Sequence, residues 1–204
     1  MPNILFLSDN NTFKSDILDQ IAHHAEGFCV IEDDGIADVV IVDEDIKLLE
    51  NFLKKDIKAP IILLSSKEID DTIGAHHIIY KPMNLSDFLD DIKASINVYE
   101  KSSEGKLEFN NYILNPSHKE ILNLRNNEIT KLTEKEVAII KYLYKNRDKT
   151  IGKNDLIQEV WGYSADVYTH TVETHIYRLR QKVEHDDVSA QLIITSDGGY
   201  SLKF

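Results

Sequence analysis

A dense group of hydrogen-bonding and cationic side chains lies between residues 169 and 184. The apolar residues of this segment recur at helical spacing, at Val172, Ile176, Leu179 and Val183, which predicts a helix with one buried face. The other side of that helix presents groups that suit phosphate oxygens and the base edges of a DNA major groove. These residues are His170, Thr171, Thr174, His175, Tyr177, Arg178, Gln181 and Lys182. Since a bare run of this kind is usually only a solvated helix face, the neighbouring elements must decide between the two interpretations.

The segments around this helix have the order of a winged helix–turn–helix domain. Thr133 and Glu136 form a capping-box pair that begins one helix, and a second helix is predicted over about residues 153–161. After the third helix, residues 192–195 and 200–204 flank a glycine-containing turn and predict a hairpin. Four short strands, with Asn-Asn turns at residues 110–111 and 126–127, are predicted ahead of the helices, over about residues 107–131. This α+β order favours a DNA-reading helix over a merely solvated one.

Polar side chains also follow the predicted strands in the first half of the chain. Apolar runs at residues 4–7, 28–31, 39–42, 61–64 and 77–80 alternate with helix-like segments. This pattern is typical of a five-stranded, doubly wound α/β domain with a parallel sheet. In such a sheet ligands gather beyond the carboxyl ends of the strands. The side chains expected there are Ser8, Asp9, Asp43, Ser65 and Lys81.

These strand-end residues suit the transfer of a phosphoryl group. The carboxylates of Asp9 and Asp43 could hold Mg²⁺, which neutralises the charge of an incoming phosphoryl group. Asp43 could then accept phosphate covalently, while Ser65 bonds a phosphoryl oxygen and Lys81 pairs with its charge. The alternative is that Asp43 is a solvated remnant of such a site.

Charge separates the two halves of the chain. The net charge is −12, yet residues 1–100 carry 8 Lys and Arg against 20 Asp and Glu, whereas residues 101–204 carry 15 of each. The polar stretch at residues 99–105 is predicted as a linker between a domain at residues 1–98 and a second domain at residues 106–204. Because DNA binding needs only a local basic face, the acidic total does not exclude it.

Two connections in the first domain are short. Residues 32–38 are too few for a helical crossover, and residues 65–76 leave room for about two helical turns. No apolar run is long enough for a membrane span, and the N-terminus lacks the features of a signal peptide. The single cysteine, Cys29, cannot form an internal disulfide and is expected to be buried on a strand. We therefore expect a cytoplasmic protein that does not bind membranes.

The segment from residue 132 to residue 204 closely resembles the C-terminal domain of OmpR/PhoB-type response regulators. The resemblance rests on Leu132-Thr133-Glu134-Lys135-Glu136, Val160-Trp161-Gly162-Tyr163, the run from Thr171 to Lys182, and Gly199-Tyr200. The first domain is similar to a receiver domain, notably at Lys81-Pro82. The resemblance implies a two-component regulator of transcription, not an enzyme, that binds direct-repeat double-stranded DNA as a head-to-tail homodimer.

The resemblance also implies roles for individual residues. The family's DNA contacts fall on Thr171, His175, Arg178 and Arg180, which match by identity. At His170 and Tyr177 the family often has arginine. The loop at residues 162–168 lies where family members contact RNA polymerase, and a sensor histidine kinase is the implied partner of Asp43.

Several positions depart from the family. Ser8 stands where receivers usually have a second acid, Ile78 replaces the usual switch aromatic residue, and the helix after the fourth strand is shortened. The wing has Ser196-Asp197 where an arginine usually precedes the glycines. Either control through Asp43 or an orphan regulator that works without phosphate is consistent with these features. The alternatives from other classes are a protein-interaction module that has lost DNA binding and a phosphatase.

Overall fold

A computed structural model describes residues 2–24, 27–32, 37–55, 57–70, 73–147, 149–162, 169–184, 191–196 and 198–204, with the side chains of residues 24, 169 and 170 outside the description. The chain divides into two compact units, Met1–Gly105 and Lys106–Phe204, and each has its own hydrophobic core. In these described ranges, no helix combines the length and apolar character that a membrane crossing requires.

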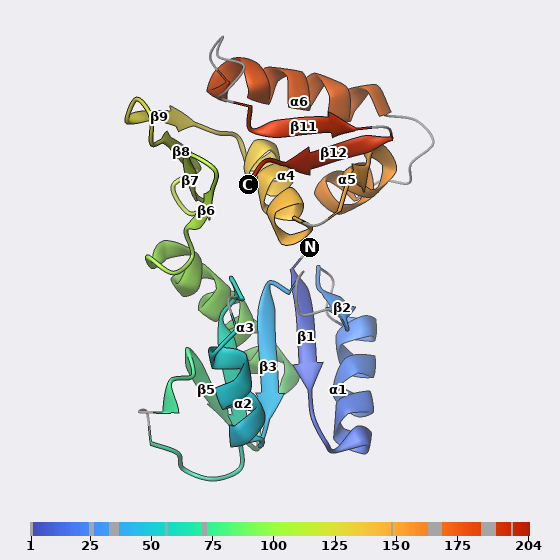
Figure 1. The fold of residues 1–204 in the computed structure, drawn as a ribbon. Coiled ribbons are helices and arrows are strands. Elements are labelled where there is room, and N and C mark those ends of the chain that lie inside the picture. Colours follow the sequence, from blue (N-terminus) through green and yellow to red (C-terminus); the bar gives the residue numbers. More distant parts are fainter. Residues whose placement is uncertain are drawn as a thin grey trace. The chain divides into compact units, whose positions relative to one another are not determined.

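The first unit is built on a five-stranded parallel sheet (Figure 1). Its strands are β1 (Asn3–Leu7), β2 (Cys29–Ile31), β3 (Val39–Asp43), β4 (Ile61–Ser65) and β5 (His77–Tyr80), in the order β2-β1-β3-β4-β5. Every residue of β3 and β4 is buried, which explains why both strands read as continuous apolar runs. The predicted five-stranded α/β fold is confirmed.

Helices cover both faces of this sheet. On one face, α1 (Asn11–His24) and α3 (Leu85–Lys101) contribute Ile21 and Phe88 to the same core cluster. On the other face, α2 (Ile46–Leu53) buries Leu49 and Phe52. The side chain of Asn84 caps α3, because it accepts a hydrogen bond from the Asp87 N–H at 2.9 Å.

The two short connections contain no α-helix in the parts that the structure describes, residues 32, 37–38, 66–70 and 73–76. Cys29 lies on a strand, as expected, but it is exposed, so the expectation that it is buried is wrong. The physical reason is its position: β2 is an edge strand that pairs only with β1, and its three residues are at most half-buried.

The last helix of the first unit continues into the stretch predicted as a linker. α3 ends at Lys101, and the Ser102 hydroxyl donates to the carbonyl oxygen of Tyr99 at 2.7 Å. Gly105 then passes so close to this turn that a Cβ atom would lie 2.4 Å from the same carbonyl oxygen. A glycine is needed for that approach, so residues 99–105 are packed against the first unit.

The second unit begins with a four-stranded antiparallel sheet. Its strands are β6 (Leu107–Phe109), β7 (Tyr112–Asn115), β8 (Glu120–Asn123) and β9 (Glu128–Lys131), paired in sequence order. Asn110 and Asn127 have φ angles of 47° and 56°, which confirms the left-handed turns predicted at the two Asn-Asn pairs.

Three helices and a hairpin follow, in the order of a winged helix–turn–helix. They are α4 (Glu134–Lys145), α5 (Lys153–Trp161), α6 (Thr169–Val183), β11 (Ile193–Ser196) and β12 (Gly199–Leu202). One strand was not predicted: β10 (Ile151–Gly152) pairs with β12, and two residues are too few to show a periodicity. A Cβ atom at Gly199 would lie 2.1 Å from the Ile151 carbonyl oxygen, so this pairing requires glycine.

The capping box predicted at the start of α4 is present. The Glu136 N–H donates to Thr133 Oγ1 at 3.3 Å, and the Thr133 N–H donates to the Glu136 carboxylate at 2.7 Å. Both bonds satisfy amide groups that would otherwise have no partner at the helix end.

The substitution Thr133→Ala tests this cap. It removes the acceptor for the Glu136 N–H, so we expect the free energy of unfolding of the second unit to fall by about 1 kcal/mol. Urea unfolding followed by the fluorescence of Trp161, the chain's single tryptophan, measures this unit. Thr133→Ser keeps the hydroxyl and should change little. Equal stability of Thr133→Ala and wild type would contradict the role of the cap.

Candidate functional site

An apolar face fixes α6 to the second unit. Val172, Ile176, Leu179 and Val183 are all at most 3% exposed and belong to the core, at the spacing that the sequence predicts. The other side of α6 therefore faces outward, and the helix lies on the outside of its unit over the β11–β12 hairpin (Figure 1).

Four side chains on the outward side are exposed: Thr174, Tyr177, Arg178 and Gln181. Tyr177 has an exposed fraction of 64%. Arg178 differs from the other described Arg and Lys residues of α6, because it forms no hydrogen bond or ion pair within the described chain, whereas Arg180 and Lys182 both do. Among the cations of α6, Arg178 is therefore the one that no described residue engages.

Lys182 is turned toward α4. Its Nζ lies 2.8 Å from Glu136 Oε2 and 3.4 Å from the Lys131 carbonyl oxygen, and the Glu136 side chain is only 5% exposed. Burial would raise the pKa of Glu136, but the bonds from Lys182 and Thr133 outweigh burial and hold that pKa below its usual value. A charged carboxylate in the interior requires such a partner, so Lys182 is committed to the domain itself.

Arg180 is turned toward the hairpin. Its Nη2 donates to the Ile193 carbonyl oxygen at 2.7 Å and to Thr195 Oγ1 at 2.8 Å. Its Nε lies 3.7 Å from Glu184 Oε2. The sequence placed Arg180 among the DNA contacts, but in the structure its guanidinium group is engaged with β11.

His175 packs against an aromatic ring. Its imidazole lies 5.0 Å from the ring of Trp161, measured between centroids. Burial, together with the positive charge of Arg178, lowers the pKa of His175 below its usual value of 6.5. Because its pKa lies below 6.5, His175 is a neutral hydrogen-bonding group at pH 7. Thr171, one turn earlier on the helix, is half-buried.

Three predicted features lie outside the described residues: the side chain of His170, residues 163–168 of the loop after α5, and Asp197 in the turn of the hairpin. Glu173, also on α6, forms an ion pair with Lys153 at the start of α5. The sequence did not predict the contacts that Lys153, Glu184 and Trp161 make with α6 and β11, because these contacts join residues that are apart in the chain.

The first unit brings four of the five predicted strand-end residues to one pocket. Ser8, Asp9, Asp43 and Lys81 line a cavity of about 560 Å³ at the carboxyl ends of the strands. Ser8 Oγ donates to Asp43 Oδ2 at 2.6 Å, and Lys81 Nζ donates to Asp43 Oδ1. Asp43 is only 5% exposed, and each of its two oxygens accepts a bond from one of these partners.

Glu44 is a further carboxylate of this pocket, beside Asp9 and Asp43, and it was not predicted from the sequence. Lys81 Nζ lies 3.2 Å from Glu44 Oε1, which also accepts the Ser66 N–H at 2.8 Å. Burial would lower the pKa of Lys81, but its bonds to Asp43 and Glu44 outweigh burial and raise that pKa. Burial would raise the pKa of Glu44, but the bonds from Lys81 and Ser66 outweigh the effect of burial and lower that pKa.

The two remaining pocket candidates differ in position. Asp9 is exposed at the pocket, whereas Ser65 is buried and uses its hydroxyl on the backbone of Lys67, donating to the carbonyl oxygen at 2.9 Å. Asp9 and Asp43 offer two carboxylates, a set that suits Mg²⁺ because this ion keeps several of its waters in protein sites. The described ranges contain no cluster of three or more His, Cys, Asp or Glu arranged for a metal.

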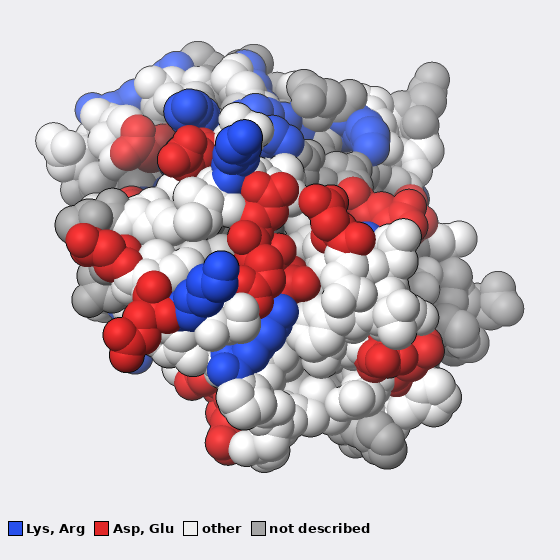
Figure 2. All heavy atoms as spheres, turned by 90° about the horizontal axis from the view of Figure 1, so that it is seen from below, with Lys and Arg blue, Asp and Glu red and all other residues white. Residues whose placement is uncertain are grey.

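The surroundings of the pocket are mixed in character. Figure 2 looks onto the molecule from the side where the strands of the first unit end, and shows Asp and Glu gathered beside Lys and Arg.

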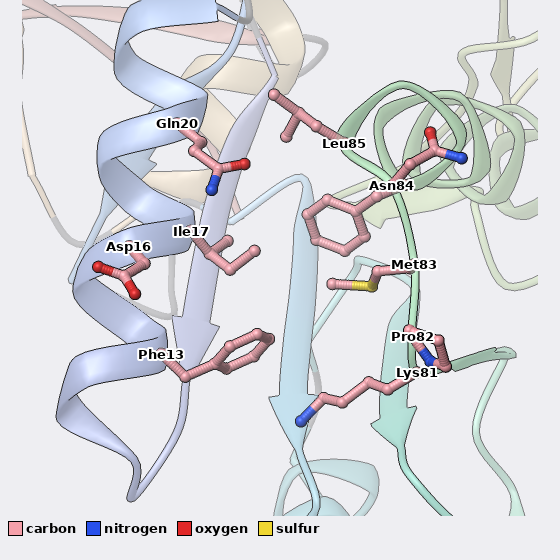
Figure 3. Close-up of a pocket in the computed structure, with 10 residues that line it drawn as sticks. Phe13, Asp16, Ile17, Gln20, Lys81, Pro82, Met83, Asn84 and Leu85 are labelled. Atoms are coloured by element: carbon pink, nitrogen blue, oxygen red, sulfur yellow. The ribbon is translucent and has the colours of Figure 1, made fainter.

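A second cavity of about 390 Å³ lies between α1 and the start of α3 (Figure 3). Phe13, Ile17 and Met83 point into it, and Lys81 Nζ lies 4.2 Å from the centroid of the Phe13 ring. Lys81 therefore borders both the acidic pocket and an apolar one.

A parallel α/β domain with an Asp–Lys pocket at its strand ends, followed by a helix–turn–helix and a hairpin, defines a response regulator with a winged-helix output domain. The comparisons agree. The family model described as "Transcriptional regulatory protein, C terminal" matches residues 126–202.

Relatives extend the match to most of the chain. The chain is 30% identical over 184 residues to the probable transcriptional regulator ycf27 of Guillardia theta, covering 80% of this chain and 72% of that protein. It is 32% identical over 162 residues to the ycf27 protein of Porphyridium aerugineum, covering 72% and 68%. It is 29% identical over 174 residues to the heme response regulator HssR of Staphylococcus epidermidis, covering 80% and 77%. The chain belongs to the OmpR/PhoB-type response regulators, which are DNA-binding regulators of transcription and not enzymes.

The lowered pKa of His175 predicts a pH dependence of stability. Below about pH 6.5 the unfolded chain takes up a proton at this residue that the folded state resists, so the stabilisation is complete above that pH and is lost as the pH falls toward the folded pKa. By NMR titration we expect a midpoint for His175 below 6.5. His175→Gln should lessen the loss of stability on acidification, whereas His118→Gln, at an exposed site in the same unit, should not. A midpoint at or above 6.5 would contradict the burial argument.

Proposed function

We propose that this regulator binds promoter DNA as a homodimer and that the outward face of α6 reads the major groove. The observation that carries the proposal is Arg178, an exposed arginine without an intramolecular partner in the described chain, on the third helix of the helix–turn–helix. An arginine guanidinium matches the O6 and N7 acceptors of guanine. Thr174, Tyr177 and Gln181 beside it supply further hydrogen-bonding groups.

The other DNA contacts predicted from the sequence have different parts in this proposal. His175 is neutral and offers hydrogen bonds without charge, and Lys182 neutralises Glu136. DNA affinity then depends on fewer cations than the composition of α6 suggests. A second copy of the chain would supply a second α6, and the loop at residues 162–168 would contact RNA polymerase.

Arg178→Ala tests the outward face. Losing a paired contact to guanine costs about 1–3 kcal/mol, so we expect roughly 5- to 150-fold weaker binding to promoter DNA. Fluorescence anisotropy with a labelled promoter fragment, at several salt concentrations, measures the affinity. Arg147→Ala removes the same charge from an exposed position just after α4 and is the matched control.

Two results would count against the proposal. Equal affinities for Arg178→Ala and Arg147→Ala would contradict a contact through Arg178. Wild-type affinity that does not fall with salt would favour a protein-interaction module, because a duplex binder that neutralises Z phosphates shows a log–log slope of about −0.9Z.

We further propose that phosphorylation of Asp43 by a sensor histidine kinase controls this activity. The carboxylate of Asp43 would attack the phosphorus atom as the donor's leaving group departs, and Lys81 would pair with the phosphoryl charge. Asp9 and Asp43 would hold Mg²⁺, which neutralises phosphate charge when it is bound. For attack, an Asp43 oxygen would use a lone pair other than the one that accepts the bond from Ser8 or Lys81.

The bond between Ser8 and Asp43 supports a second candidate, a regulator that works without phosphate. The hydroxyl occupies one oxygen of the nucleophile, and it stands where a second acid would strengthen the metal site. In this candidate the network of Ser8, Asp43 and Lys81 stabilises the receiver fold and carries no signal.

Incubation with acetyl phosphate and Mg²⁺, followed by intact mass measurement, separates the two candidates. Control through Asp43 predicts one added phosphoryl group on wild type, none on Asp43→Ala, and a greater extent on Ser8→Asp, which restores the acid pair. Wild type that stays unmodified while Ser8→Asp is phosphorylated would overturn the phosphorylation proposal in favour of the phosphate-independent regulator.

A further inference from the structure

We infer that Arg180 and Glu184 form a clamp that fixes the β11–β12 hairpin against α6, and that Arg180 serves DNA binding as a positioning residue instead of touching DNA. The inference deepens the proposed DNA-binding function and rests on it. Its basis is a set of bonds that join Arg180 and Glu184, at the end of α6, to Leu192 and the first residues of β11.

Glu184 holds the backbone at the start of the hairpin. Its Oε1 accepts the N–H groups of Leu192 at 2.7 Å and of Ile193 at 2.9 Å. Both residues are fully buried, and the Glu184 side chain is only 12% exposed. A carboxylate with so little access to water requires partners. The two amides donate hydrogen bonds to Glu184, and the nearby positive charge of Arg180 adds an ion pair.

Arg180 holds the same strand from one helical turn earlier. Its Nη2 donates to the Ile193 carbonyl oxygen and to Thr195 Oγ1, and its Nε faces Glu184 Oε2 at 3.7 Å. The two side chains therefore bond both backbone groups of Ile193, the N–H through Glu184 and the carbonyl through Arg180. A shift of β11 along α6 would break bonds to both side chains.

The clamp affects DNA binding because it connects α6, the helix proposed to enter the major groove, to the rest of its domain. β12 pairs with β11 and also with β10, which leads directly into α5. The orientation of α6 against this sheet determines how its outward face enters a groove. Moving Arg180 to a DNA phosphate would leave the Glu184 carboxylate, which is only 12% exposed, without its cation, and this is costly.

The two possible roles of Arg180 predict opposite effects of neutralising Glu184. If Arg180 contacts phosphate, removing a negative charge beside it strengthens or preserves DNA binding. If the pair is a clamp, the loss of Glu184 loosens the hairpin and weakens DNA binding, although the domain becomes more positive.

The experiment compares promoter affinity in the full-length wild type, Arg180→Gln, Glu184→Ala and the double variant, by anisotropy over a salt series. We expect each single change to weaken binding by roughly 3- to 10-fold, with an unchanged salt slope, and the double variant to be no weaker than the worse single one, because coupled residues are non-additive. Glu184→Gln, which keeps an acceptor oxygen for the amides, should recover part of the loss. Without DNA, NMR should show faster hydrogen exchange at the Leu192 and Ile193 amides in Glu184→Ala.

Other results would overturn the inference. A salt slope lowered by about 0.9 in Arg180→Gln, full recovery in Arg180→Lys, and unchanged or tighter binding by Glu184→Ala would make Arg180 a phosphate contact. Unchanged amide exchange in Glu184→Ala would refute the clamp independently of DNA. The proposed function has its own failing result: wild type that shows no salt-dependent binding to DNA, together with no effect of Arg178→Ala. In that case the positioning role of Arg180 would fail as well.

Discussion

The carboxylate of Glu136 lies almost out of contact with water beside α6, and Lys182 together with the Thr133 N–H keeps it charged there. Glu184, which directly follows α6, is also largely shielded from water, and its partners are Arg180 and two amide groups. A buried charge without a partner costs several kcal/mol, so these carboxylates determine where the nearby cations lie. Two of the three described Arg and Lys residues of α6 are thereby directed inward, and Arg178 remains for an external ligand.

The same constraint shapes the pocket of the first unit. Asp43 is buried at the end of β3, and Ser8 and Lys81 each take one of its oxygens. Lys81 also bonds Glu44, and the bonds to Asp43 and Glu44 together raise the pKa of Lys81 although burial would lower it. A network that satisfies Asp43 stabilises the sheet edge, but it also opposes the use of Asp43 as a nucleophile. In each unit, the charged groups that stabilise the fold are among those that the proposed function would use.

Much of the fold could be predicted because periodicity is local. The parallel strands, α6 and the cap at Thr133 follow from spacing within about ten residues, and the structure confirms them. β10 was missed because two residues carry no period, and Cys29 was misjudged because edge position is not visible in the residue itself. For the site, the sequence identified the charged side chains of α6 but not their partners, since the contacts of Lys182 with Glu136 and of Arg180 with Ile193 join residues 46 and 13 positions apart.

Arg178 and Arg180, two residues apart on one helix, serve different purposes in the binding of DNA that we propose. NMR of the arginine guanidinium N–H groups, including the Nη–H groups that bond β11 in Arg180, tests this most directly when recorded on the full-length protein with and without a promoter fragment. The account predicts that the Arg178 resonance shifts and becomes protected only when DNA is added, whereas the Arg180 resonance is already protected in the free protein and stays in place. A shift and new protection at Arg180, with Arg178 unaffected by DNA, would contradict it.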